Sequence, residues 1–181
     1  MNPLTPSARL AAAAFSVLWL TGCATLSVSS YVERGADFKQ YQTYNWAPAA
    51  PEPTGDPRLD SNPFFHDRVK ADIETELGRR GFEKTFEPPD LLLHYHANVR
   101  QRIDVNRIDR EHGYCEANDC RPFVYEAGTL LLDVVDTRTN KIIWRGWVED
   151  SIDGLVDDQR LMEKRIDETV ARLIERLPSR L

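Results

Sequence analysis

Three segments in the second half of the chain have the composition and pattern of β-strands. In the first, alternate residues from Leu91 to Val99 are apolar and share one face, while the residues between them are mostly polar. The other two, Thr129–Thr137 and Lys141–Asp150, are separated by Arg138-Thr139-Asn140. Because Asn tolerates the left-handed conformation that ends a three-residue hairpin loop, this part is predicted to form an antiparallel sheet.

The hairpin loop also predicts which residues face each other across the two strands. Asp133 falls opposite Arg145, with Val135 opposite Ile143 and Leu131 opposite Trp147. A cross-strand ion pair between Asp133 and Arg145 would explain both charges on largely apolar strands. The alternative is that Asp133 belongs to an active site.

Two segments have the period of amphipathic helices. The first opens at Asn62-Pro63, with Asn as N-cap and Pro in the first turn, and closes at Gly81. Its apolar stripe is Phe65, Val69, Ile73 and Leu77. The second runs from about Asp157 or Asp158 to Leu177 and is stopped by Pro178. Its predicted buried face is Leu161, Ile166, Val170, Leu173, Ile174 and Leu177.

The remaining segments are shorter strands and connections. Ser27–Arg34, Tyr41–Trp46 and Phe82–Phe86 are predicted to be short strands. Residues 47–63 hold five prolines and almost no large apolar side chain, which predicts an extended surface connection. Residues 101–126 are polar and charged, and are predicted to form a long excursion or ragged hairpin. The chain is therefore expected to fold as one α+β domain over residues 28–181, a mostly antiparallel sheet of about five to six strands packed by two helices in two layers.

The first 22 residues have the pattern of a removable secretion signal. Arg9 precedes the apolar run Leu10–Leu20, which is too short to span a bilayer. The run ends in Leu20-Thr21-Gly22-Cys23, which resembles the lipobox of bacterial lipoproteins. The resemblance implies that Cys23 is acylated and becomes the first residue of the mature chain, with residues 23–27 as a short tether. The alternative is an ordinary signal peptide with Cys23 at the cleavage site by chance.

Charge and tether together limit the partners. Removal of the signal takes away one basic residue, Arg9, and no acid, so the mature chain carries a net charge of about −7. This argues against nucleic-acid binding and against electrostatic adhesion to anionic lipid. Ala24 follows the Cys in place of the Asp that enteric bacteria use for inner-membrane retention, which favours the outer membrane, facing the periplasm. Five extended residues reach at most ~18 Å, so the domain is expected to lie close to the bilayer.

Cys115 and Cys120 are the other two cysteines. In an oxidising compartment a close pair of this kind predicts a disulfide. A bridge across so short a loop stabilises the fold by only about 2 kcal/mol. The alternative is a metal site with His112 as a third ligand, although no fourth ligand stands at a familiar spacing.

Two further patterns raise the question of a metal. His94 and His96 would lie on one face of a strand about 7 Å apart, but Asn98 and Arg100 continue the same polar row, so a solvent-facing surface is favoured. The acids of Glu149–Gly154 resemble the start of a calcium loop, yet Arg160 stands where a bidentate Glu must be. A looser cation site remains the alternative to a turn that caps the last helix. No metal or cofactor is predicted.

The mature chain also lacks the familiar signatures of catalysis. No Ser stands in a G-x-S-x-G turn, no Gly-rich phosphate loop is present, and the two loop cysteines are expected to be oxidised. A pair of carboxylates brought together by the fold is invisible in a sequence and stays open.

From Tyr31 onward the chain resembles a family of bacterial lipoproteins known as domain of unknown function 4136. The resemblance implies an envelope lipoprotein of about this size and supplies no activity, cofactor or catalytic residue. It rests on Asp37-Phe38, Tyr41, Tyr44, Trp46, Gly81-Phe82, Pro89-Asp90-Leu91, Gly128-Thr129-Leu130, Asp133, Asp136 and Trp144-x-Gly146.

Taken together, these patterns favour a membrane-anchored, non-enzymatic binding or assembly-support module. One alternative is an envelope hydrolase with a carboxylate or metal site. The other is a carrier of an apolar ligand, which requires a pocket between sheet and helices.

Overall fold

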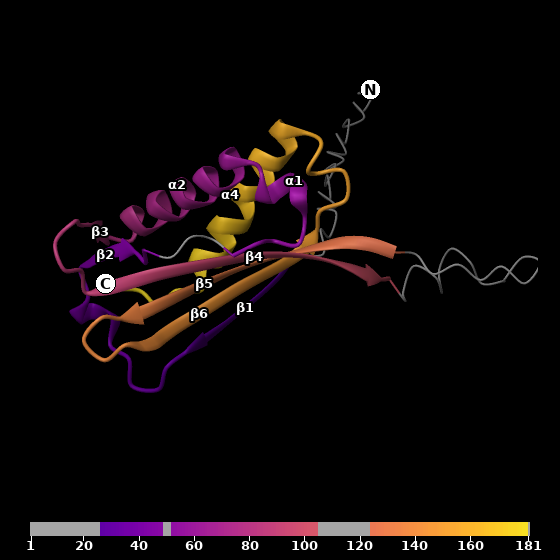
Figure 1. Cartoon of the computed structure of the whole chain (residues 1–181). Coiled ribbons are helices and arrows are strands. Elements are labelled where there is room, and N and C mark those ends of the chain that lie inside the picture. Colours follow the sequence, from indigo (N-terminus) through magenta and orange to yellow (C-terminus); the bar gives the residue numbers. More distant parts are fainter. Residues whose placement is uncertain (1–25, 49–51, 105–123, 181) are drawn as a thin grey trace, which may run out of the picture.

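The computed structural model describes residues 26–48, 52–104 and 124–180. They form one six-stranded sheet with helices on one face (Figure 1), so the predicted two-layer α+β class is confirmed. The strands are β1 (Ser27–Val32), β2 (Thr43–Trp46), β3 (Glu83–Lys84), β4 (Leu91–Ile103), β5 (Val124–Asp136) and β6 (Lys141–Ser151). The helices are η1 (Phe38–Gln40), α1 (Pro57–Asp60), α2 (Pro63–Arg79) and α4 (Gln159–Glu175).

The sheet has the order β1-β6-β5-β4-β2-β3. Its pairs are antiparallel except for β2, which runs parallel to β3 and β4. The first two strands are thus far apart, because β1 pairs with β6 while β2 pairs with β4. We give names to the two ends of the sheet. The tether end is where β1 begins, β4 ends and β6 ends, and the turn end is where β5 joins β6.

The alternation predicted for Leu91 to Val99 is confirmed. Leu91, Leu93 and Tyr95 are buried beneath α2 and α4, and every second residue of β5 and β6 joins them in the core. Val69, Ile73 and Leu77 are the buried stripe of α2, as predicted, whereas Phe65 is only half-buried. Asn62 stands at the N-cap of α2 with extended backbone, but its side chain makes no capping hydrogen bond.

Two predictions about the core are wrong. Leu161 is 43% exposed, and Met162 takes its place on the buried face of α4. The connection 47–63 is also not purely a surface segment. Asp56 caps the single-turn helix α1 by accepting from the Arg58 N–H, and this turn buries Leu59 against the core.

The hairpin of β5 and β6 differs slightly from the expected one. Asp133 pairs with Arg145 and Leu131 with Trp147, as predicted, but Val135 pairs with Ile142 instead of Ile143. The turn comprises four residues, 137–140, with Asn140 in the left-handed region at φ 53°. A β-bulge between Val134 and Val135 absorbs the resulting one-residue shift, so the register beyond it is unchanged.

No helix in the described part of the chain is both long and apolar enough to cross a bilayer.

Candidate functional site

Several residues predicted to be functional lie outside the described residues. These are the lipidation residue Cys23, the proposed disulfide pair Cys115 and Cys120, and His112.

Asp133 and Arg145 form a bidentate ion pair on the face of the sheet away from the helices. Arg145 Nε and Nη2 donate to the two carboxylate oxygens of Asp133, each at 2.6 Å. Asp133 is buried although Arg145 is partly exposed. The hydrogen bonds also raise the pKa of Arg145. With both oxygens held this way, Asp133 serves to join two strands.

His94 and His96 lie on the same outer face of β4. His96 Nδ1 is 3.5 Å from the carboxylate of Glu52. His94 lies opposite Asp133 in the register of β4 and β5. Among residues 26–48, 52–104 and 124–180, no three His, Cys, Asp or Glu side chains come together as a metal site requires.

The acids of Glu149–Gly154 are each engaged by protein groups. Glu149 pairs with Arg102 at 2.6 Å, Asp150 with Arg165 at 2.9 Å, and Asp153 accepts from the Glu126 N–H at 2.9 Å. Each carboxylate therefore has its own partner, and within the described residues the three do not form a metal-binding group.

Three residues behind the family resemblance, Tyr41, Asp90 and Asp136, hydrogen-bond near the turn end. Asp90 accepts from the backbone N–H groups of Gln42 and Thr43, and these bonds lower its pKa. Asp136 accepts from the buried Tyr41 hydroxyl at 2.9 Å. Burial alone would raise the pKa of Asp136, but its hydrogen bonds lower it on balance. These contacts hold loops to the sheet.

The fold assembles one carboxylate pair that sequence reasoning missed. Asp72 of α2 and Asp167 of α4 meet at Arg68, whose Nε lies 3.1 Å from Asp72 and 3.2 Å from Asp167. Burial, reinforced by Asp167, raises the pKa of Asp72 to about 6 against the opposing effect of Arg68. The hydrogen bond with Asp72 in turn lowers the pKa of Asp167. Because they lie on different helices, periodicity gave no signal that they meet.

This pair predicts a pH-dependent stability. Since the folded pKa of Asp72 is above its unfolded value, its contribution is largest at acidic pH and declines as pH rises through about 6. Asp72→Asn removes that decline, so the variant should be more stable than the parent at pH 7.5. The advantage should shrink towards pH 4. Urea unfolding at both pH values checks this, and an equal effect at both would contradict it.

A second missed cluster surrounds Tyr95. The Tyr95 hydroxyl lies 2.6 Å from His66 Nδ1, and burial raises the pKa of Tyr95 to about 12 and lowers that of His66. The two side chains therefore share a hydrogen bond, and burial favours the neutral form of each. Lys70 Nζ stands 5.7 Å from the Trp46 ring and 5.9 Å from the Tyr95 ring, so the cluster ties α2 to the sheet.

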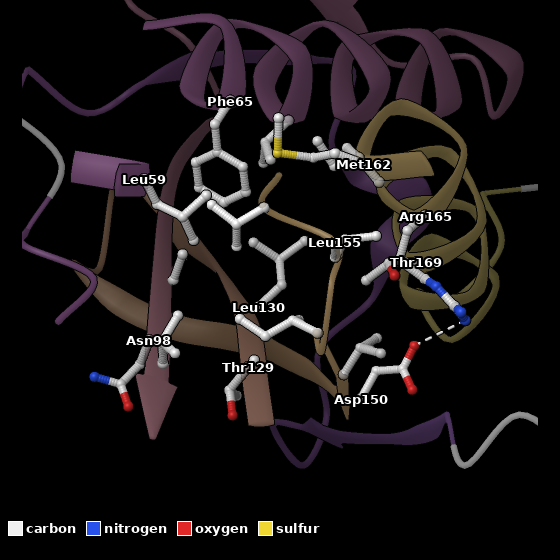
Figure 2. Close-up of a pocket in the computed structure, with 18 residues that line it drawn as sticks. Leu59, Phe65, Asn98, Thr129, Leu130, Asp150, Leu155, Met162, Arg165 and Thr169 are labelled. Atoms are coloured by element: carbon white, nitrogen blue, oxygen red, sulfur yellow. Dashed lines mark ion pairs between the residues drawn. The ribbon is translucent and has the colours of Figure 1, made fainter. Parts of the chain in front are cut away.

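An apolar cavity at the tether end is the feature that looks most like a binding site. It measures about 80 Å³ and lies between the sheet and the first turns of α2 and α4 (Figure 2). Asn98 and Thr129 also border it, but their side chains point away from it. Its apolar wall includes Leu59, Phe65, Val69, Val99, Leu130, Val148, Ile152, Leu155, Met162 and Ile166.

Charge reaches the cavity only at one edge. Asp150 and Arg165 form an ion pair there, and Asp150 Oδ1 also accepts from the Ser151 N–H at 2.9 Å. Gly128 allows Ile152 to pack closely in the wall of the cavity, because a Cβ at position 128 would come within 2.7 Å of Ile152 Cγ2. Neither Asp72 nor Asp167 lines the cavity. The arrangement suits apolar binding, and the two charged side chains in its lining, Asp150 and Arg165, are paired with each other.

Comparison with known proteins gives a family and a fold. Residues 28–179 match the family model described as Domain of unknown function (DUF4136). No curated protein shows significant sequence similarity to the chain.

Several solved structures superpose on this chain. A PDZ domain protein from Parabacteroides distasonis superposes with a TM-score of 0.51 at 13% identity, over 86% of this chain and 35% of that one. The chain thus spans about a third of that protein. A PelC variant dodecamer from Paraburkholderia phytofirmans gives 0.50 at 11% identity, over 86% and 99%. A DUF4136 family protein from Bacteroides thetaiotaomicron gives 0.49 at 10% identity, over 80% and 93%.

Proposed function

The chain belongs to the DUF4136 family, a domain of unknown function, and from that premise we propose that it is a lipid-anchored envelope protein acting as a non-enzymatic binding module. Its address is the periplasmic face of the outer membrane. The lipobox-like Leu20-Thr21-Gly22-Cys23 and the Ala24 that follows it support this address. The tether is short, so the module works near the bilayer surface.

The apolar cavity is the observation that carries the binding role. Its wall is almost entirely aliphatic and aromatic, and the one charged pair at its edge is internally neutralised. Catalysis needs a polarised group aimed at a substrate, whereas an apolar hollow gains free energy from any apolar group that fills it. The cavity therefore supports binding over hydrolysis.

The size of the cavity limits what it binds. At about 24 cal/mol per Å³, filling 80 Å³ contributes about 2 kcal/mol, which alone gives only weak affinity. An engineered cavity that holds benzene is about 150 Å³. The smaller cavity of this protein therefore suits a single apolar side chain or the end of an acyl chain. We propose that it receives an apolar side chain of an envelope protein, whose further contacts on the surrounding surface supply the remaining affinity.

Site-specific crosslinking in cells tests the binding role. A photoreactive benzoylphenylalanine is placed at Phe65, which lines the cavity, or at Phe86, which is 95% exposed near the turn end. The Phe65 position should give a defined protein adduct, and the Phe86 position should not. Adducts with lipid alone at Phe65 would favour the carrier of an apolar ligand instead. No adduct at Phe65, or the same adducts at both positions, would refute the binding site.

The anchor has a separate test. Cys23→Ala should move the protein from the membrane fraction to the soluble fraction of the envelope, because the acyl chains are lost. Unchanged membrane fractionation of this variant would contradict the lipid anchor while leaving the crosslinking result to stand by itself.

A further inference from the structure

Two strands extend beyond the rest of the sheet at the tether end. The pairing of β5 with β6 stops at Ala127 and Ser151, whereas β5 and β4 continue to pair as far as Val124 and Ile103. The result is a two-stranded arm, Gln101–Ile103 with Val124–Glu126, that projects from the body of the domain (Figure 1).

Two exposed apolar side chains lie where the described pairing of the arm ends. Ile103 and Val124 are direct cross-strand partners, and they are 56% and 45% exposed. Such partners lie side by side on one face of the ladder. The exposed apolar residues at the turn end are not partners of one another. Phe86 follows β3 in a loop and Ile142 pairs with the buried Val135, while Tyr31 and Val32 pair with Arg145 and Trp144. The arm thus presents one exposed apolar cross-strand pair.

The arm is held beside the start of the tether. Ser27, the first residue of β1, pairs with Glu149 of β6, and the Glu149 carboxylate binds Arg102 Nη1 at 2.6 Å. Leu26, the residue before β1, packs against the core. Four extended residues reach about 14 Å, which brings an acylated Cys23 and the arm to the same region of the bilayer surface.

We propose that the Ile103–Val124 pair docks into the interfacial layer of the lipid bilayer that holds Cys23. The inference rests on the proposed lipid anchor and adds a second attachment point to it. Charged side chains near the arm are paired, since Arg102 binds Glu149 at 2.6 Å and Glu126 binds Arg58 at 3.1 Å. Apolar contact therefore carries the docking, and anionic lipid is not required. Two attachment points fix the orientation, with the cavity end towards the membrane.

Fluorescence quenching by brominated lipid tests the docking. The full-length lipoprotein, processed in cells, is reconstituted into vesicles of phosphatidylcholine with brominated or ordinary acyl chains. Ile103→Trp and Val124→Trp place a reporter on the arm, and Ile142→Trp places a matched reporter at the turn end, where Ile142 is 37% exposed. The native tryptophans are common to all three variants, so the parent supplies their background.

The arm reporters should be quenched several-fold more than the Ile142→Trp reporter, and equally in the presence of high salt. Vesicle flotation of the parent reports on the anchor independently. Flotation with equal quenching of all reporters would overturn the docking and leave the anchor intact. Stronger quenching at position 142 would overturn the docking and invert the orientation. Failure of the processed parent to float would overturn both the anchor and the docking.

Discussion

Gly146→Ala should destabilise the domain by about 3 kcal/mol, at the upper end of the usual cost of overpacking a core. A Cβ at this position would clash with the indole ring of Trp144 and lie 2.7 Å from Leu173 Cδ1. Trp144 is fully buried, and its Nε1 donates to the Arg176 carbonyl at 3.3 Å. The ring cannot move without losing that bond and its contact with α4. Urea unfolding followed by tryptophan fluorescence measures the loss.

The chain offers a matched control for this substitution. Gly78 is exposed in the last turns of α2, and a Cβ there would meet nothing within 4 Å. Gly78→Ala should therefore raise the free energy of unfolding by up to about 1 kcal/mol, because Ala is the better helix former. An unchanged midpoint for Gly146→Ala would show that α4 and the Trp144 ring adapt freely, which the packing argues against.

Arg145→Ala should cost about 3 kcal/mol. It removes both strong hydrogen bonds from a carboxylate that is only 5% exposed, and leaves the charge of Asp133 unpaired. The expected cost is at the low end for a buried pair, because Arg145 is partly exposed and water reaches its side of the pair. Urea unfolding at neutral pH measures it.

The double variant Asp133→Leu with Arg145→Met separates charge from packing. Replacing both partners with apolar side chains leaves no unpaired charge, so most of the stability should return. If the double variant is as unstable as Arg145→Ala, the pair contributes through packing and not through its charges. A folded double variant that loses the crosslink from Phe65 would instead give this pair a role in binding.

Local patterns predicted most of the sheet and both long helices. Alternation placed Leu91, Leu93 and Tyr95 on the buried face, and a short loop was enough to pair Asp133 with Arg145. The choice of Leu161 over Met162 misjudged the helical period, because Met162 stands four residues before Ile166, about one turn, whereas Leu161 stands five before it. The core selects Met162, which lines the cavity. The bulge between Val134 and Val135 could not be predicted, because it depends on a four-residue turn that the sequence allowed but did not require.

Candidate site features were mostly beyond prediction, for a different reason. The cavity, the Asp72–Asp167 pair and the His66–Tyr95 pair each unite residues that are distant in the chain. Periodicity describes one element at a time and says which face is apolar. It does not say which elements meet or how well their side chains fill the space between them.

The pairing of β1 with β6 has a consequence for how the protein assembles. β1 can join the edge of the sheet only after Ser27 has paired with Glu149, which lies near the other end of the chain. Contacts so remote in sequence slow folding, because the intervening loop must close before any contact rewards it. A chain synthesised from its N-terminus therefore stays open until its last strand is available. That delay would suit the export proposed above, because an exported chain passes through a translocation pore unfolded and folds only on the far side.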